Sequence, residues 1–123
     1  MKILIAEDEE FLRLILNDFL SELGHEVKCA GNGIELVSLA MSERPDLVIT
    51  DLNMPEMSGD SMIAMLDMYP GLAGIPVIIV SGEPASAVKD MGIPKEIPVL
   101  PKPFNFAMIV REISRFERAV REG

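Results

Sequence analysis

Carboxylates gather at two points of the sequence where an apolar run ends. Glu7 and Asp8 follow the run at residues 3–6, and Asp51 ends the run at residues 46–51. If these runs are neighbouring parallel strands, their carboxyl ends meet at one edge of a sheet. Three close carboxylates repel one another unless a cation lies among them, and hard oxygen ligands suit Mg²⁺. The pattern therefore predicts a magnesium site, although Glu7 and Asp8 could simply form the acidic first turn of a helix.

A hydroxyl and an ammonium group follow two later apolar runs. Ser81 comes after residues 77–80, and Lys102 stands between two prolines after residues 97–100. Taken alone, such a serine is usually a turn former, and such a lysine is usually solvated. Together with the acids and a divalent cation, they supply an attacking oxygen and donors for charged oxygens. Those are the components of phosphoryl transfer.

These groups meet only if short strands alternate with helices. The apolar runs predict five strands, at about residues 3–6, 27–30, 46–51, 77–80 and 97–100. Helical spacing predicts five helices, at about residues 9–23, 34–44, 59–69, 85–91 and 105–120. We expect one domain over residues 1–123 with an α/β, flavodoxin-like (βα)5 three-layer fold. Its parallel five-stranded sheet would have the order 2-1-3-4-5, with the strand that contains Pro98 at an edge.

The first predicted helix has a long apolar stripe. Its inward residues would be Phe11, Leu12, Ile15, Leu16, Phe19, Leu20 and Leu23. In the next two helices we expect Met41 and Tyr69 to point inward, and Asn105 can cap the last helix.

The order and spacing of these motifs resemble the receiver domains of two-component response regulators, over nearly the whole chain. Residues 51–59 read DLNMPEMSG and are similar to the family's D-x-x-M-P-x-x-x-G. Residues 102–104 read KPF and match its K-P-F. The resemblance implies a signalling module that accepts a phosphoryl group and switches conformation. Such a module is not an enzyme in the usual sense, because it catalyses only its own phosphorylation and dephosphorylation.

The resemblance also implies a role for each residue at the site. Asp51 would accept the phosphoryl group from a sensor histidine kinase or a phosphotransfer protein. Ser81 would hydrogen-bond the phosphoryl oxygens, Lys102 would pair with them, and the Lys102–Pro103 bond would be cis.

The same resemblance implies how Mg²⁺ would be held beside Asp51. Asp8 would bind the ion directly, and Glu7 would reach it through water. The backbone carbonyl of Asn53 would be a further ligand.

One position departs from the family pattern. Receiver domains commonly have Tyr or Phe three residues before the lysine, where this chain has Val99. Because Val99 is short and stiff at χ1, we expect switching to rely on residues 82–87 instead. A downstream target or output domain would bind the face formed by the fourth helix, fifth strand and last helix.

Three other functions compete with phosphoryl acceptance. A pseudo-receiver would be an interaction module that is not phosphorylated, and Glu7 and Val99 are its support. An aspartyl-phosphate phosphatase of the haloacid dehalogenase type needs a second aspartate where this chain has Asn53. A flavin or nucleotide carrier needs a phosphate-cradling loop after the first strand, where residues 7–10 are all acidic.

Composition sets the expected location and partners. The net charge of -9 argues against direct nucleic-acid binding. No apolar run approaches the ~18 residues of a membrane span, and the N-terminus does not resemble a signal peptide. The single Cys29 excludes an internal disulfide. We expect a cytoplasmic protein that does not contact membranes.

Overall fold

The computed structural model describes residues 1–54, 57–84, 87–88, 93–103 and 105–122. Residues 53–54, 57–60, 62–63 and 120–122 are described in their backbone only. The strands of the main sheet are β1 (Lys2–Ala6), β2 (Glu26–Ala30), β3 (Leu47–Asp51), β6 (Val77–Ser81) and β7 (Val99–Pro101). The helices with stated bounds are α1 (Glu10–Glu22), α2 (Gly33–Ser42), α3 (Gly59–Met68) and α5 (Phe106–Glu122). A small hairpin, β4 (Asn53–Met54) and β5 (Met57–Ser58), follows β3.

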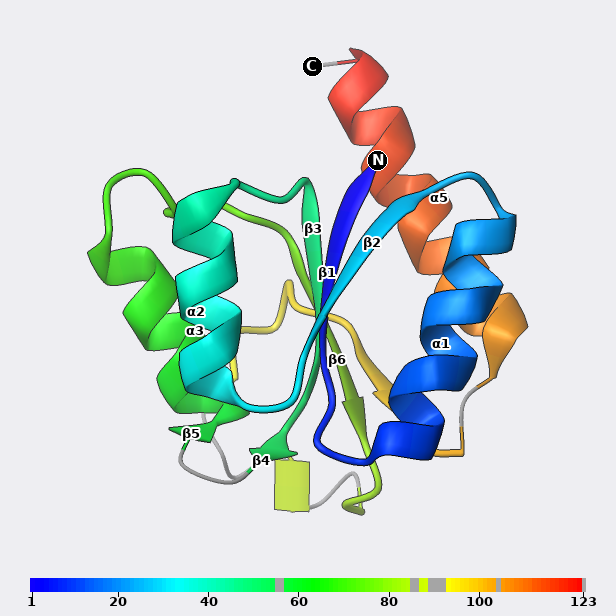
Figure 1. The fold of residues 1–123 in the computed structure, drawn as a ribbon, viewed down its shortest axis with the longest axis horizontal. Helices are drawn as coiled ribbons and strands as arrows, with labels where there is room; N and C mark the ends of the chain where they lie inside the picture. Colours follow the sequence, from blue (N-terminus) through cyan, green and yellow to red (C-terminus); the bar gives the residue numbers. More distant parts are fainter. Residues whose placement is uncertain (55–56, 85–86, 89–92, 104, 123) are drawn as a thin grey trace.

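The main sheet is parallel and has the order β2-β1-β3-β6-β7. The hairpin strands β4 and β5 form a separate sheet, so β6 and β7 are the fourth and fifth strands of the main sheet along the chain. The predicted order 2-1-3-4-5 is therefore confirmed. Helices α1 and α5 cover one face, and α2 and α3 cover the other (Figure 1). The central strands β3 and β6 are buried at every position, as expected of apolar strands covered on both faces.

Alternate residues of β1 supply two separate cores. Ile3 and Ile5 pack with α1 and α5, whereas Leu4 and Ala6 belong to the core beneath α2 and α3. Side chains of a strand alternate between faces, so one apolar strand can serve both layers. On the first side, the rings of Phe19 and Phe106 lie 4.3 Å apart between centroids and join α1 to α5. The two cores hold the strand ends, and therefore the site, in fixed positions.

Side-chain caps define where two helices begin. Asn105 accepts a hydrogen bond from the backbone N–H of Met108 at 3.1 Å, which confirms the predicted cap of α5. Asn32 accepts from the N–H of Glu35 at 2.8 Å and caps α2 in the same way.

Four residues predicted to point inward are exposed instead. Phe11 is 68% exposed, Leu23 50%, Met41 57% and Tyr69 40%. The buried residues of α1 are Leu16 and Leu20, and at 100° per residue Phe11 lies about 140° around the helix from Leu16. Phe11 therefore faces away from the core although its spacing to other apolar residues looked regular.

The last strand is shifted from its predicted position. It covers Val99–Pro101 and not residues 97–100. Pro98 has no N–H, but its carbonyl accepts from the N–H of Ile79 at 2.9 Å, just before the strand begins. The edge position of this strand is confirmed. The predicted fourth helix, residues 85–91, lies almost entirely outside the described residues. No described helix has the length and apolar character needed to cross a membrane.

Candidate functional site

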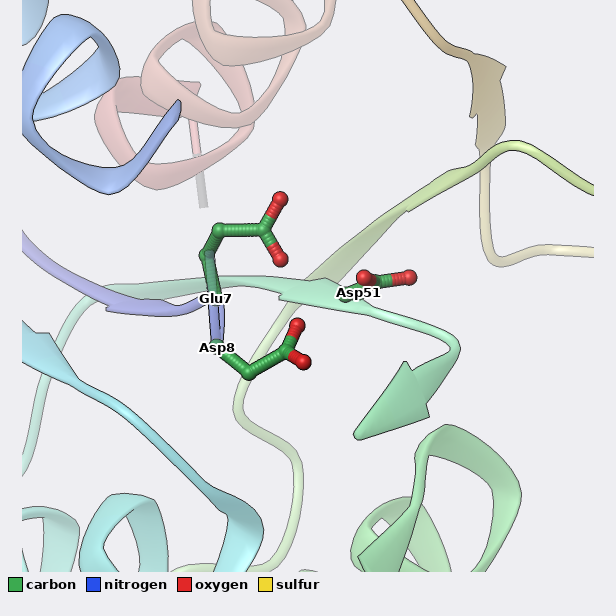
Figure 2. A group of neighbouring side chains, drawn as sticks. All are labelled: Glu7, Asp8 and Asp51. Carbon is green, nitrogen blue, oxygen red and sulfur yellow. The ribbon is translucent and has the colours of Figure 1, made fainter. Parts of the chain in front are cut away.

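The predicted site residues lie together at the carboxyl edge of the sheet. Glu7 follows β1, Asp51 ends β3 and Ser81 ends β6, while Lys102 follows β7. Figure 2 shows the carboxyl groups of Glu7 and Asp8 projecting toward Asp51. The edge between β1 and β3 is the topological switch point of this fold, where ligands of open α/β sheets bind.

Lys102 joins the two buried carboxylates of the site. Its Nζ donates to Oε1 of Glu7 at 2.7 Å and to Oδ2 of Asp51 at 2.8 Å. The side chains are 18%, 3% and 11% exposed for Lys102, Glu7 and Asp51, so water screens these contacts poorly. The backbone N–H of Lys102 donates to the carbonyl of Ser81 at 2.9 Å, and the Lys102–Pro103 bond is cis, as expected. The backbone of Lys102 is therefore fixed by its hydrogen bond to Ser81, and its ammonium group is fixed by the two carboxylates.

The environment of Glu7 favours its neutral form. Burial raises the pKa of Glu7 from 4.5 to about 7, and the nearby Asp51 adds to the rise, although Lys102 opposes both. For Lys102, burial works to lower the pKa, but the hydrogen bonds and charges of Asp51 and Glu7 outweigh it and raise the pKa overall. Lys102 therefore stays protonated at neutral pH, whereas Glu7 can gain or lose its proton there.

The three acids fit a small divalent cation. One carboxylate oxygen from each of Glu7, Asp8 and Asp51 lies within 4.8 Å of the others. Asp8 is exposed, which leaves a path for a hydrated ion. In the structure described, Oε2 of Glu7 is buried and has no hydrogen-bond partner. A cation or its bound water would satisfy that oxygen, and carboxylate ligands with retained water suit Mg²⁺.

Arg13 is a positioning residue that the sequence did not reveal. Its Nη1 donates to the backbone carbonyl of Glu7 at 2.8 Å, and the N–H of Glu7 donates to the carbonyl of Ala30 at 3.1 Å. A Cβ at Gly31 would lie 3.3 Å from this Arg13 nitrogen, so the glycine leaves room for the guanidinium. An arginine on a helix surface has no distinctive spacing in the sequence, which is why this role of Arg13 was not predicted.

Ser81 ends β6 at the carboxyl edge of the sheet, and Asn53 begins the hairpin that follows β3. Ser81 is 3% exposed, and its Oγ accepts from the N–H of Glu83 at 3.0 Å. It stands one residue beyond Val80, which is the partner of Asp51 across β3 and β6. The backbone of Asn53 begins the hairpin two residues after Asp51 and pairs with Ser58. Val99 is half-buried and packs against the core beneath α2 and α3.

Comparison with known proteins defines the family. The sequence model of the family described as the response regulator receiver domain matches residues 3–114 of this chain. The sensory/regulatory protein RpfC of Xanthomonas campestris pv. campestris is 40% identical over 86 residues, covering 68% of this chain and 12% of RpfC. This chain therefore corresponds to a small part of that relative.

Two solved structures have the same fold over nearly their whole length. One is the receiver domain of a histidine kinase from Syntrophus aciditrophicus, with 30% identity and a TM-score of 0.86 over 99% of this chain and 93% of that one. The other is the response regulator TrrA of Thermotoga maritima, solved with Mg²⁺ and BeF, with 26% identity and a TM-score of 0.82 over 94% of this chain and 97% of that one. The fold and site define a receiver of two-component signalling. The chain belongs to the response regulator receiver family.

Proposed function

We propose that Asp51 accepts a phosphoryl group from a phosphohistidine of a sensor kinase or phosphotransfer protein, in a reaction that needs Mg²⁺. The observation that carries this proposal is the Asp51 carboxylate at the switch point, bonded to Lys102 at 2.8 Å and grouped with Glu7 and Asp8. A buried carboxylate without partners would be a poor nucleophile. The Asp51 carboxylate instead contacts the Lys102 ammonium, and the acid cluster is accessible to solvent at the exposed Asp8.

The proposed step is an in-line displacement at phosphorus. An oxygen of Asp51 forms the new P–O bond while the P–N bond to the histidine breaks, and the released imidazole takes a proton. The products are an aspartyl phosphate and a neutral histidine. Bound Mg²⁺ would supply charge stabilisation for the phosphoryl oxygens, held by Asp8, by Glu7 through water, by Asp51 and by the carbonyl of Asn53.

Two side chains of this site would then respond to the new charge. Lys102 already reaches Asp51 and can turn its ammonium from the carboxylate to a phosphoryl oxygen. Ser81 can exchange its hydrogen bond with the N–H of Glu83 for one in which its hydroxyl donates to the phosphoryl group. Such an exchange would move the segment after β6. We expect this movement to transmit the phosphorylation of Asp51 to the rest of the domain.

The wider role follows from the same chemistry. The chain would act as a phosphoryl acceptor that catalyses only its own phosphorylation and dephosphorylation. It would work in the cytoplasm, with a histidine kinase upstream and a target protein or output domain on the face that includes β7 and α5. The relative from Syntrophus is a histidine kinase receiver, which supports a kinase partner.

Phosphorylation can be tested without the partner kinase. We expect acetyl phosphate with Mg²⁺ to add one phosphoryl group to the protein, measured by intact mass, and EDTA to prevent the addition. Asp51→Asn should abolish it, whereas Asp46→Asn, which changes an exposed carboxylate that accepts from the N–H of Lys2, should not. If the wild type remains unmodified under these conditions, the pseudo-receiver interpretation replaces this proposal.

A further inference from the structure

Helix α5 carries a row of exposed arginines. Arg111, Arg115 and Arg118, which we call the arginine stripe, are spaced four and three residues apart and are all exposed. Residues at this spacing share one face of a helix. Glu112 lies next to the stripe and pairs with Arg115, but its side chain is only 14% exposed, against 63% for Arg115. Glu117 reaches within 4.0 Å of His25, on the body of the domain.

Much of the stripe is not used by the fold itself. Arg115 pairs with Glu112 at 3.0 Å, but within the described part of the chain neither Arg111 nor Arg118 forms an ion pair. Arg13 and Arg44 behave differently, because each donates to backbone carbonyls and so has a structural use. As far as the described side chains go, Arg111 and Arg118 are therefore available to bind another molecule.

The arginine stripe is positively charged, whereas the protein as a whole is negatively charged. The chain has a net charge of -9, yet residues 111–121 contain four of its eleven basic residues. The C-terminal turns of α5 project beyond the end of the sheet (Figure 1). A narrow positive surface on a projecting helix can be reached by a partner that avoids the acidic body.

We propose that the arginine stripe binds an acidic segment of a partner protein. This inference rests on the signalling role proposed above and names the chemistry of its output partner. Arginine suits this use because its guanidinium forms paired hydrogen bonds with carboxylates and loses little hydration at an interface. Val110, which is 36% exposed beside the stripe, adds a small apolar contact.

A nucleic acid fits the same surface less well. Its phosphates extend along the whole strand, so a bound duplex would also lie against the acidic remainder of the domain. A short acidic protein segment can end where the stripe ends. The spacing of the stripe matches carboxylates on one face of a helix, at positions i, i+4 and i+7.

The test uses a defined probe. A fluorescein-labelled helical peptide with glutamates at i, i+4 and i+7 is titrated with the full chain at low ionic strength, and fluorescence anisotropy gives Kd. A second peptide has glutamine at those positions. The stripe variant is Arg111→Gln with Arg118→Gln. The matched control is Lys28→Gln with Lys95→Gln, which removes the same charge from exposed sites elsewhere.

We expect the stripe variant to bind the glutamate peptide about fivefold more weakly than the control, and added salt to weaken binding by the wild type. Equal Kd values for the two variants, equal binding of both peptides, or tighter binding of single-stranded DNA than of peptide would each overturn the proposal. Both variants should still accept a phosphoryl group from acetyl phosphate. A wild type that binds the peptide through the stripe but is not phosphorylated would contradict only the function proposed above.

Discussion

Replacing Lys102 with methionine would expose how far the site depends on one positive charge. Methionine keeps much of the length of the side chain but removes the ammonium that contacts Glu7 at 2.7 Å and Asp51 at 2.8 Å. Both carboxylates are nearly buried. Removing one partner of a buried ion pair costs about 3–5 kcal/mol, because the remaining charge is left without compensation.

The cost should depend on pH in a specific direction. Glu7 has a pKa of about 7 in the folded protein, so it is largely neutral at pH 5.5 and needs the ammonium less there. Near pH 8, Glu7 is largely charged in the wild type, and the variant must either keep this buried carboxylate without the ammonium or take up a proton. We therefore expect a loss of about 3–5 kcal/mol at pH 8 and roughly half of that at pH 5.5.

Urea unfolding in EDTA, followed by circular dichroism, gives these free energies at both pH values. Lys28→Met is the matched control, because Lys28 pairs with Glu43 at 2.8 Å but its side chain is 48% exposed. An exposed pair contributes only about 0–1 kcal/mol. The reasoning is refuted if Lys102→Met costs no more than Lys28→Met, or if its cost is the same at both pH values.

Three further predictions concern the metal, the titration of Glu7 and the switch. Asp8→Ala should abolish the rise in Tm that Mg²⁺ gives the wild type, which at a few times Kd corresponds to about 1 kcal/mol; an unchanged rise would place the ion elsewhere. Because the folded pKa of Glu7 is raised from 4.5 to about 7, the folded state binds more protons between those values, so metal-free stability should fall as pH rises through this window and then level off. A rise in pKa from 4.5 to about 7 corresponds to a fall of about 3 kcal/mol, which should be absent in Glu7→Gln; parallel pH profiles of the two proteins would contradict it. Beryllofluoride with Mg²⁺ should change hydrogen exchange most in the segment that starts at Ser81 and Gly82 and least around Val99, and the reverse pattern would make Val99 the switch.

The site could be predicted because strand ends are easy to recognise in this sequence. Apolar runs such as Val77-Ile78-Ile79-Val80 mark buried parallel strands, and the residues at the carboxyl end of each run lie at the functional edge. Glu7, Asp51, Ser81 and Lys102 all stand at or within two residues of such an end. The sheet order followed from the handedness of crossover connections, which leaves few arrangements for five strands.

Other features depend on contacts that local sequence does not encode. The exposure of Phe11 is decided by where the sheet lies relative to α1, and the apolar spacing of that helix allowed either orientation. Arg13 reaches the carbonyl of Glu7 only because α1 returns beside the end of β1, next to a glycine that leaves space. The raised pKa of Glu7 likewise comes from burial beside Asp51, which only the assembled fold creates.

The most direct test of the account is to identify the phosphorylated residue chemically. The protein is treated with acetyl phosphate and Mg²⁺, reduced with borohydride, digested and sequenced by tandem mass spectrometry. Borohydride converts an aspartyl phosphate to homoserine, which marks the residue by its mass. The account predicts homoserine at position 51 and nowhere else among the acids of the site. Homoserine at position 8, or a phosphate that resists reduction on a serine or histidine, would contradict it.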